Sequence, residues 1–559
     1  MQLILLPKYE QILSDTPETI SDYIRRIGKR MVLQFCTHFM YRNLQDDQQN
    51  VIGFWSKYFS SDNERFANDV IGKLLELSKS NRVAVIHTQN LYMLMDAALS
   101  VSMQEDLSST LSNAAIERYF FKSLLVANNL ILVHQDEGVK ETEKYCLSNP
   151  QINKFPILIL ANQLAYGDFE FALNDEVIIT QLYKCVCFFK FAERKFPKHV
   201  EYYLQEKGFT DWKEYIKILC GIAFKTIKVE KGSTFINIPS DNNDRALECC
   251  LQLCYTTIND YTNDLDFIQL RNFPLFQWKD NEFLILSKLF LSEKLYQSLY
   301  FEFNSINNKL LPPDRIKEFR SKIGYEFSER TLLYEVLNRL FRDNVIKMTG
   351  KEIADLVGDG GCDYYARSGN KVYIFECKDI LMPKQTKTSY NALLLMEFLY
   401  NRLVQSNDNK KAVMQLLQNI QFIRDNKIES NRTDGTKMTI YPIIVTHHRV
   451  FDTPAMNYVI DCWFRQYLQE LEIVNKDRIK PVVIINIDTL IMMKDLCRQR
   501  SVVFKDLLDK YISNVLRDER LALKNSYLSF ADKMHDNIFS THQFPKGASD
   551  FVKILFNDV

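Results

Sequence analysis

Three short runs of uninterrupted apolar residues in the second half of the chain restrict its fold more than any other feature. They lie within KVYIFECKD (371–379), TIYPIIVTHH (439–448) and KPVVIINIDTL (480–490). Each run is short and rich in β-branched and aromatic residues, which is typical of a strand. Because neighbouring residues of a strand point to opposite faces, an unbroken apolar run predicts a strand that is covered on both faces. The three runs therefore predict a central sheet between helices.

Segments with apolar residues at three- and four-residue steps flank and separate these runs, as expected for the covering helices. They span 327–344, 389–403, 410–426, 456–474 and a tail from Phe504. We predict a C-terminal α/β domain with a central mixed sheet.

The first 300 residues follow a different pattern and are predicted to be mostly α-helical. Apolar residues from Asp22 onward, such as Ile24, Ile27 and Met31, keep helical spacing, and no fixed repeat period recurs. Polar, turn-forming stretches interrupt the pattern at 230–244 and at 304–324, where Pro312 and Pro313 are incompatible with a continuous helix. The expected domains are 1–305, which the break at 230–244 divides into two subdomains, then 325–500, then a helical tail at 501–559.

Composition narrows the class of protein. The chain has 559 residues, enough for two to four domains, and its 46% hydrophobic and 25% charged residues are typical of a globular protein. The chain has 70 lysine plus arginine residues and 70 aspartate plus glutamate residues, so its net charge indicates no partner.

The 12 cysteines follow no disulfide or zinc-site spacing and are expected to be free buried thiols in a reducing cytoplasm. We expect no signal peptide, no membrane span and no membrane partner.

An acid and a lysine end the first predicted strand. Glu376 and Lys378 are two residues apart, so they share one face of the strand. Ser368-Gly369-Asn370 is a good hairpin turn, and it would return the preceding strand so that Asp363 meets Glu376 at the same end of the sheet. Two carboxylates suit a hard cation such as Mg²⁺, which takes its other ligands from water and phosphate oxygens. A lysine beside that cation can orient a water or stabilise the negative charge that develops on a phosphate.

These residues resemble the PD-(D/E)XK nuclease superfamily, whose members have the restriction-endonuclease-like fold. The pattern D-x12-E-x-K on a hairpin carries the resemblance over about 325–490, although Cys362 stands where many members have proline. The resemblance implies that Asp363 and Glu376 bind Mg²⁺ or Mn²⁺ and that Lys378 serves the attacking water. It also implies an acid on the preceding helix, Glu335 or, as second choice, Glu329.

A glutamine on the following helix assists in some members of the superfamily. Gln415 is the candidate here, with Gln418 behind it. His447 and His448 end the second predicted strand, where one of them could contact a phosphate or both could face a loop without partners. Lys384 and Lys387 follow the first predicted strand, where they could line a channel for a nucleic-acid backbone or belong to an ordinary solvated loop.

The resemblance implies a metal-dependent nuclease that cleaves nucleic acid, DNA rather than RNA. The helical region would then act as a sensor, a surface for a protein partner or an oligomerisation element, a combination common in microbial restriction and anti-phage defence. Two alternatives stay open. One is a catalytically silent adaptor that binds nucleic acid or protein, and the other is a helical scaffold with a purely structural α/β domain.

Overall fold

The structure is a computed structural model of the whole chain. It describes residues 4–40, 47–101, 111–149, 153–170, 174–225, 234–238, 244–255, 265–358, 360–407, 409–428 and 434–539. The chain forms two compact units, and each is assembled from two separate stretches of sequence. The first unit combines 138–213 with 299–559, and the second combines 2–137 with 214–298.

A mixed sheet organises the first unit. Within the described residues it has five strands in the order β12-β11-β8-β7-β6. β8 pairs in parallel with β11, and β11 with β12, while β7 is antiparallel to both β8 and β6. The strands are β6 (Ile346–Thr349), β7 (Tyr364–Ser368), β8 (Lys371–Lys378), β11 (Thr439–Thr446) and β12 (Val483–Asn486).

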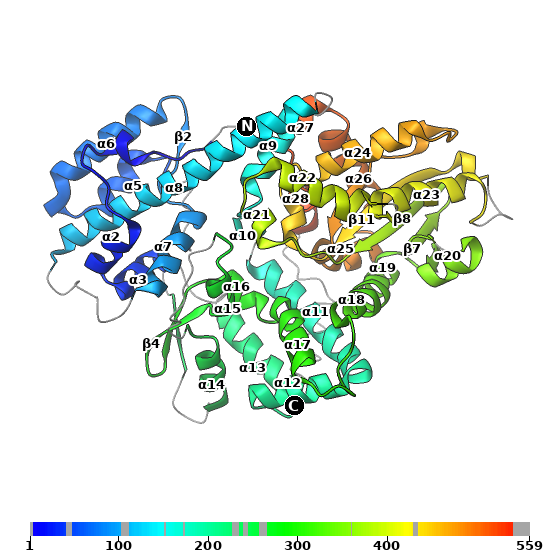
Figure 1. The fold of residues 1–559 in the computed structure, drawn as a ribbon, viewed down its shortest axis with the longest axis horizontal. Helices are drawn as coiled ribbons and strands as arrows, with labels where there is room; N and C mark the ends of the chain where they lie inside the picture. The colour runs from blue at the N-terminus through cyan, green and yellow to red at the C-terminus, as the bar shows by residue number, and fades with distance from the viewer. Residues whose placement is uncertain are drawn as a thin grey trace. The chain divides into compact units, whose positions relative to one another are not determined.

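Helices cover both faces of this sheet. α23 and α24 pack against each other and against the sheet, and α19 (Tyr334–Leu340) packs against α25 (Figure 1). Phe341 and Phe504 cover the face that carries Tyr373 and Phe375. The interior of β8 is buried throughout, as its apolar run predicts. The C-terminal helices are α20 (Gly350–Val357), α21 (Lys384–Lys387), α22 (Ala392–Leu399), α23 (Ala412–Arg424), α24 (Met456–Glu470), α25 (Ile487–Arg498), α26 (Phe504–Tyr511), α27 (Glu519–Lys524) and α28 (Phe530–Phe539).

Helices that precede the five-stranded sheet in the sequence complete the first unit. They are α9 (Lys154–Gln163), α10 (Gly167–Glu170), α11 (Asn174–Lys195) and α12 (Pro197–Lys207), followed by α17 (Gln297–Lys309) and α18 (Phe319–Ile323). Phe188 and Phe191 of α11 contact Phe327 with ring centroids 5.2 and 5.4 Å apart. The division into compact units therefore differs from the expected boundary between 305 and 325, because 138–213 pack with the sheet-containing half of the chain.

The second unit is mostly helical, as the spacing of its apolar residues predicts. It also contains a three-stranded antiparallel sheet among its described residues, ordered β3-β5-β4, which the sequence did not lead us to expect. Its elements are β1 (Ile4–Leu5), α1 (Tyr9–Ile12), α2 (Ile20–Ile27), α3 (Lys29–Met40), α5 (Val51–Tyr58), α6 (Glu64–Ser78), β2 (Arg82–Val83), α7 (Thr88–Ser100), the first part of α8 (Asn113–Ser148), most of α13 (Trp212–Lys225), β3 (Phe235–Asn237), α14 (Asp244–Gln252), α15 (Ile268–Asn272), β4 (Leu275–Lys279), β5 (Glu282–Ile285) and α16 (Lys288–Glu293).

A π-helix precedes α19 in the first unit. The 327–344 segment was expected to be one α-helix, but residues Gly324–Leu333 form i→i+5 turns, here called η4, and only Tyr334–Leu340 (α19) is α-helical. The hydroxyl of Thr331 donates to the carbonyl oxygen of Glu326, five residues back, at 2.7 Å. Two shorter π-helices, Tyr400–Val404 and Ile512–Leu516, also occur among the described residues, so the π-helical form does not by itself mark η4 as a functional segment.

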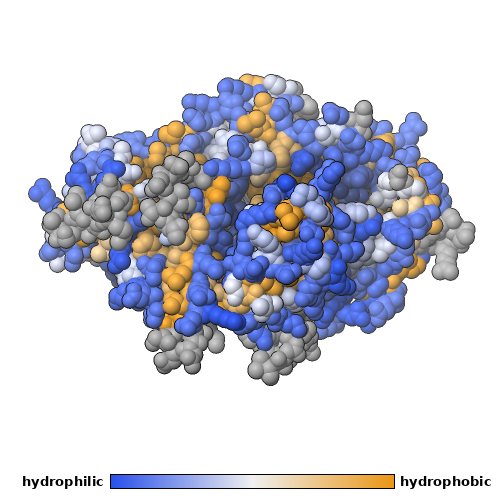
Figure 2. Space-filling view, turned by 60° about the horizontal axis from the view of Figure 1, so that its bottom comes forward, coloured by the Kyte–Doolittle hydropathy of each residue, from blue (hydrophilic) through white to orange (hydrophobic). Residues whose placement is uncertain are grey.

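The surface shown in Figure 2 is largely hydrophilic, with hydrophobic residues in smaller groups between the polar ones. No helix among the described residues is long and apolar enough to cross a membrane. All twelve cysteines lie within the described ranges and are free thiols, ten of them buried, as expected.

Candidate active site

The β7–β8 hairpin brings Asp363 to the level of Glu376. Ser368 pairs with Lys371 across a two-residue turn, as the sequence predicts, and Tyr364 pairs with Phe375 at the other end. The backbone N–H of Asp363 donates to the carbonyl oxygen of Phe375 at 3.0 Å, which extends the ladder by one residue. The Asp363 carboxylate accepts a 2.6 Å hydrogen bond from the backbone N–H of Cys377. The two acids therefore lie side by side at the end of β8.

Glu376 and Lys378 interact on one face of β8, as their spacing predicts. The Nζ of Lys378 donates to Oε2 of Glu376 at 3.0 Å, and the Glu376 side chain is 1% exposed. Its second oxygen, Oε1, is buried and has no hydrogen-bond partner. A buried carboxylate oxygen without a donor is costly, so this atom indicates a place for a ligand.

The charges at this strand end do not balance. Burial and the neighbouring Asp363 carboxylate raise the pKa of Glu376 to about 8, against the opposing effect of Lys378. Burial also raises the pKa of Asp363, although Lys378 and the Cys377 N–H oppose it. Burial alone would lower the pKa of Lys378, but the two carboxylates outweigh it and the pKa is raised. Two buried acids share one ammonium group, and an added cation would lower their raised pKa values and favour the ionised form of both.

Glu329 of η4 adds a third acid to the neighbourhood. Burial and the negative charge of Asp363 raise its pKa to about 8, while Lys378 acts in the opposite direction. The same Glu329 carboxylate also contributes to the raised pKa of Glu376. Glu329 therefore lies within electrostatic reach of Asp363, Glu376 and Lys378.

The structure does not bring Glu335, the first choice for the helix acid, to this cluster. One oxygen of Glu335 accepts from the Tyr183 hydroxyl at 2.9 Å, and the other accepts from the Cys187 thiol at 3.7 Å. Both partners lie on α11. Sequence spacing alone did not show which of the two acids faces the hairpin, and the π-helical turns place the second choice, Glu329, there instead.

The glutamine candidates lie on α23, which packs against β8. The Oε1 atom of Gln415 is buried and has no hydrogen-bond partner. Gln418 instead accepts from Nζ of Lys410 at 2.9 Å, and its side chain lies against Gly360. Of the two glutamines, Gln415 is the one with a buried side-chain oxygen that has no hydrogen-bond partner, and its helix packs against β8.

Asn419 is a supporting residue that sequence reasoning missed. Its amide donates to the carbonyl oxygen of Gly360 at 3.0 Å, and its oxygen accepts from the N–H of Cys362 at 2.8 Å. Asn419 is fully buried, and it fixes the backbone that leads directly into Asp363. The available signal was a polar residue among the apolar positions of the predicted helix at 410–426.

Ser328 and Asp379 form a second supporting contact that the sequence did not reveal. The Ser328 hydroxyl donates to Asp379 at 2.6 Å, and Nε2 of His448 lies 3.2 Å from the other oxygen of that carboxylate. Despite burial, these neighbours hold the pKa of Asp379 well below its usual range. Ser328 immediately precedes Glu329, so this contact anchors η4 to the end of β8 beside the acid cluster.

The remaining candidates have structural partners. Nε2 of His447 lies 3.2 Å from the Cys377 sulfur, and burial lowers the pKa of His447 to about 4. Lys387 forms an ion pair with Asp168 at 2.9 Å. Lys384 lies in the same short helix, α21.

The donor set fits a hard cation with few protein ligands. In the part of the chain that the structure describes, no three His, Cys, Asp or Glu side chains lie close enough to hold a metal ion between them. Asp363 and Glu376 supply two carboxylates, and Glu376 Oε1 lacks a protein donor. Mg²⁺ commonly binds one or two carboxylates and keeps several waters, so the pair suits it.

Comparisons with protein-family models, with characterised proteins and with solved structures found no match for this chain.

Proposed function

We propose that the chain is a metal-dependent nuclease with a restriction-endonuclease-like domain, and that it hydrolyses phosphodiester bonds at the end of the β7–β8 hairpin. The observation that carries this proposal is the buried group of Asp363, Glu376 and Lys378. The order of helix, hairpin, helix and parallel strand around this group supports the resemblance to the PD-(D/E)XK superfamily.

Asp363 and Glu376 would hold Mg²⁺ or Mn²⁺, which activates water and neutralises charge on a phosphate. Lys378 already donates to Glu376 and lies within electrostatic reach of Asp363, so its ammonium group can donate to a water or to a phosphate oxygen beside the two acids. Glu329 adds a third acid, whose ionised form a bound cation would favour. Gln415 offers an unpaired buried oxygen on α23, which packs against β8.

The second unit would serve as a sensor, a partner-binding surface or an oligomerisation element for this activity. DNA is the expected substrate.

The test is cleavage of plasmid DNA, linear duplex DNA, single-stranded DNA and RNA with Mg²⁺ or Mn²⁺. Wild type is compared with Glu376→Gln, Lys378→Ala and Asp363→Asn, and Glu335→Gln serves as a matched control on the neighbouring helix. Loss of one charge-stabilising group typically lowers the rate by about 100-fold or more. We expect such losses in the first three variants and near wild-type cleavage by Glu335→Gln.

Cleavage that survives in all three site variants would refute the assignment. Metal-independent binding of the same nucleic acids without cleavage by any form would favour the adaptor instead.

A further inference from the structure

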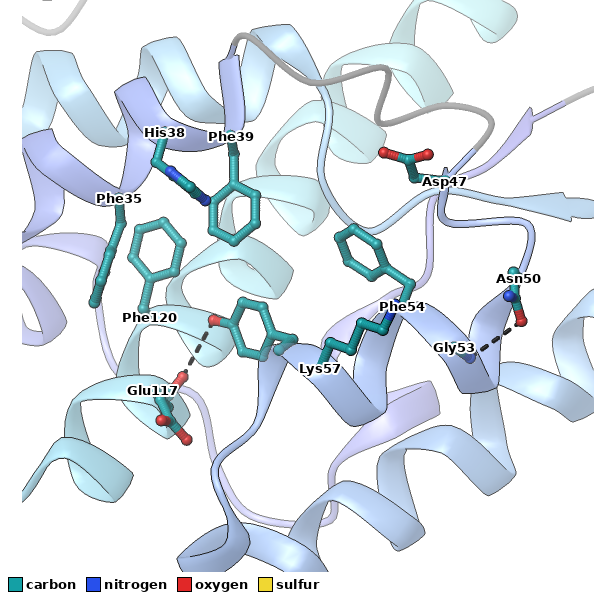
Figure 3. Close-up of a pocket in the computed structure, with 11 residues that line it drawn as sticks. Phe35, His38, Phe39, Asp47, Asn50, Gly53, Phe54, Lys57, Glu117 and Phe120 are labelled. Carbon is teal, nitrogen blue, oxygen red and sulfur yellow. Dashed lines mark hydrogen bonds between the residues drawn. The ribbon is translucent and has the colours of Figure 1, made fainter. Parts of the chain in front are cut away.

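The second unit contains a cavity of about 640 Å³ between α3, α5 and α8. All of its lining residues belong to this unit, so it is independent of the acid cluster in the first unit. Its volume lies within the range of about 300–1,000 Å³ that is typical of small-molecule sites. Figure 3 shows Phe35, Phe39 and Phe120 gathered on one side of the cavity, and Phe54, Lys57 and Asp47 on the other.

Aromatic rings form most of the cavity wall. Phe39 and Phe120 are nearly parallel, with ring centroids 6.2 Å apart, and Phe39 also stacks on Tyr58 at 5.8 Å. Phe35 meets the edge of Phe120 at 5.1 Å. Phe39 and Phe120 are buried, whereas Phe35, Phe54 and Tyr58 are half-buried. Half-buried aromatic faces held in place by a rigid ring cluster suit a planar ring as ligand.

Several polar groups of the cavity have partners within the protein: Asn50 accepts from the backbone N–H of Gly53, and the Tyr58 hydroxyl donates to the carbonyl oxygen of Glu117. Glu117 is already engaged, because one of its oxygens accepts from the backbone and hydroxyl of Ser60 at 2.9 Å and from the Asn63 amide at 2.7 Å. Lys57 and Asp47 are exposed, and neither has a hydrogen bond or ion pair with another described residue. The cavity therefore presents one available cation and one available carboxylate beside an aromatic wall.

We propose that this cavity binds a nucleoside monophosphate. The base stacks on the half-buried aromatic rings, which contact any planar base through its π-face. The ammonium group of Lys57 pairs with the phosphate. The carboxylate of Asp47 accepts hydrogen bonds from the ribose hydroxyls, a role that acidic side chains commonly take toward ribose. A planar ring, an anion and a pair of hydroxyl donors match the three kinds of group that the cavity offers.

The test is isothermal titration of the full-length chain with AMP, GMP, CMP and UMP, and separately with adenosine and inorganic phosphate. We expect at least one monophosphate to bind more tightly than either adenosine or phosphate. Lys57→Gln should weaken monophosphate binding by about tenfold, the usual effect of losing one charge-assisted hydrogen bond, and leave adenosine binding unchanged. Phe54→Ala should weaken both ligands by about tenfold because stacking is lost.

Lys73→Gln is the matched control, because Lys73 is an exposed lysine of α6 that does not line the cavity. It should bind all ligands as wild type does. Both test residues lie on the exposed or half-buried side of α5, so thermal unfolding should show that the variants fold normally. The proposal is overturned if no monophosphate binds, or if Lys57→Gln and Phe54→Ala bind the monophosphates as tightly as wild type.

Discussion

Two glutamates only six residues apart have different environments at the start of the first unit's α/β core. The charges of Asp363 and Lys378 shift the pKa of Glu329. Glu335 instead accepts hydrogen bonds from Tyr183 and Cys187. Both are acids on what the sequence presents as one helix, so residue type and spacing predicted a helix acid without identifying it. Glu329 lies on the π-helix η4 and Glu335 on the α-helix α19. The spacing of apolar residues does not show this change of helix type, so it could not show which glutamate lies near Asp363.

Glu329→Gln should weaken the binding of Mn²⁺ to the protein by about tenfold or more, because it removes a carboxyl group that a cation beside the two candidate ligands would bring into its ionised form. Titration calorimetry with Mn²⁺ measures this directly, without any nucleic acid. Glu335→Gln, the control, should change the affinity by less than about twofold, since its partners lie on α11. Equal affinities in the two variants would contradict the assignment of Glu329.

His447 should make the stability of the protein depend on pH. Burial lowers its pKa to about 4 in the folded protein, whereas an unfolded histidine titrates near its ordinary pKa of 6.5. Between these two values the unfolded chain binds more protons, so this residue's contribution to the free energy of unfolding falls as the pH drops from 6.5 to 4. The difference between the two pKa values corresponds to about 3 kcal/mol.

Urea unfolding of wild type and His447→Gln at several pH values between 7 and 4 measures this effect. The stability difference between the two proteins should shrink as the pH falls through this window, because glutamine does not titrate. A constant difference would show that His447 keeps the same pKa in both states.

At the scale of the elements, the strands were the most predictable parts. β8 and β11 follow from their apolar runs, because burial on both faces requires apolar residues at every position. The run at 480–490 was predicted to be a single strand, but β12 ends at Asn486, whose side chain caps the N-terminus of α25. The π-helical turns of η4 could not be predicted, since its apolar residues also fit an α-helix and its contacts with α11 and with β8 join residues far apart in the sequence.

The hydrogen bond from Ser328 to Asp379 should position Glu329 by anchoring η4. Ser328→Ala should lower the kcat of the proposed cleavage by about tenfold with little change in KM, because Ser328 is fully buried and acts through its hydrogen bond to Asp379. Ser328→Thr keeps the hydroxyl and should restore most of the activity. Ser321→Ala, at an exposed serine of α18, is the control and should behave as wild type in the same cleavage assay.

Asn419 should contribute more to stability than a typical surface residue of α23. Asn419→Ala leaves the buried N–H of Cys362 without its partner, and the expected loss is about 2–3 kcal/mol in the free energy of unfolding. Gln418→Ala, on the outer side of the same turn, should cost less than about 1 kcal/mol. Urea denaturation of both variants gives the comparison, and similar losses would contradict the role given to Asn419.

At the scale of the whole molecule, each compact unit draws on two distant stretches of sequence. The break at 304–324 marks a real interruption between α17 and α18, but both helices belong to the first unit. Local composition could not reveal this arrangement, because it depends on long-range contacts such as those of Phe188 and Phe191 with Phe327. The sequence predicts most of the helices and strands, but not which of them pack together in one compact unit.

A fragment of residues 299–559 should therefore not fold stably by itself. Without 138–213, it would expose Phe327 and leave Asp488 without the buried Lys184, which lies 2.6 Å from it. Co-expression with a separate 138–213 fragment should recover a soluble complex that unfolds cooperatively. A 299–559 fragment that shows a cooperative thermal transition alone, with the same midpoint as the complex, would contradict this expectation.

The interleaving of the two units also sets an order of events during synthesis, because a chain leaves the ribosome from its N-terminus. Residues 2–137 emerge first but cannot complete their core until 214–298 follow. Helices α9 to α12 emerge between these two stretches, before the later helices against which α9 and α11 pack, namely α22, α24 and α25, have been made. The second unit can thus close while the first still waits for its strands, and the acid cluster at the end of β8 forms only late in translation.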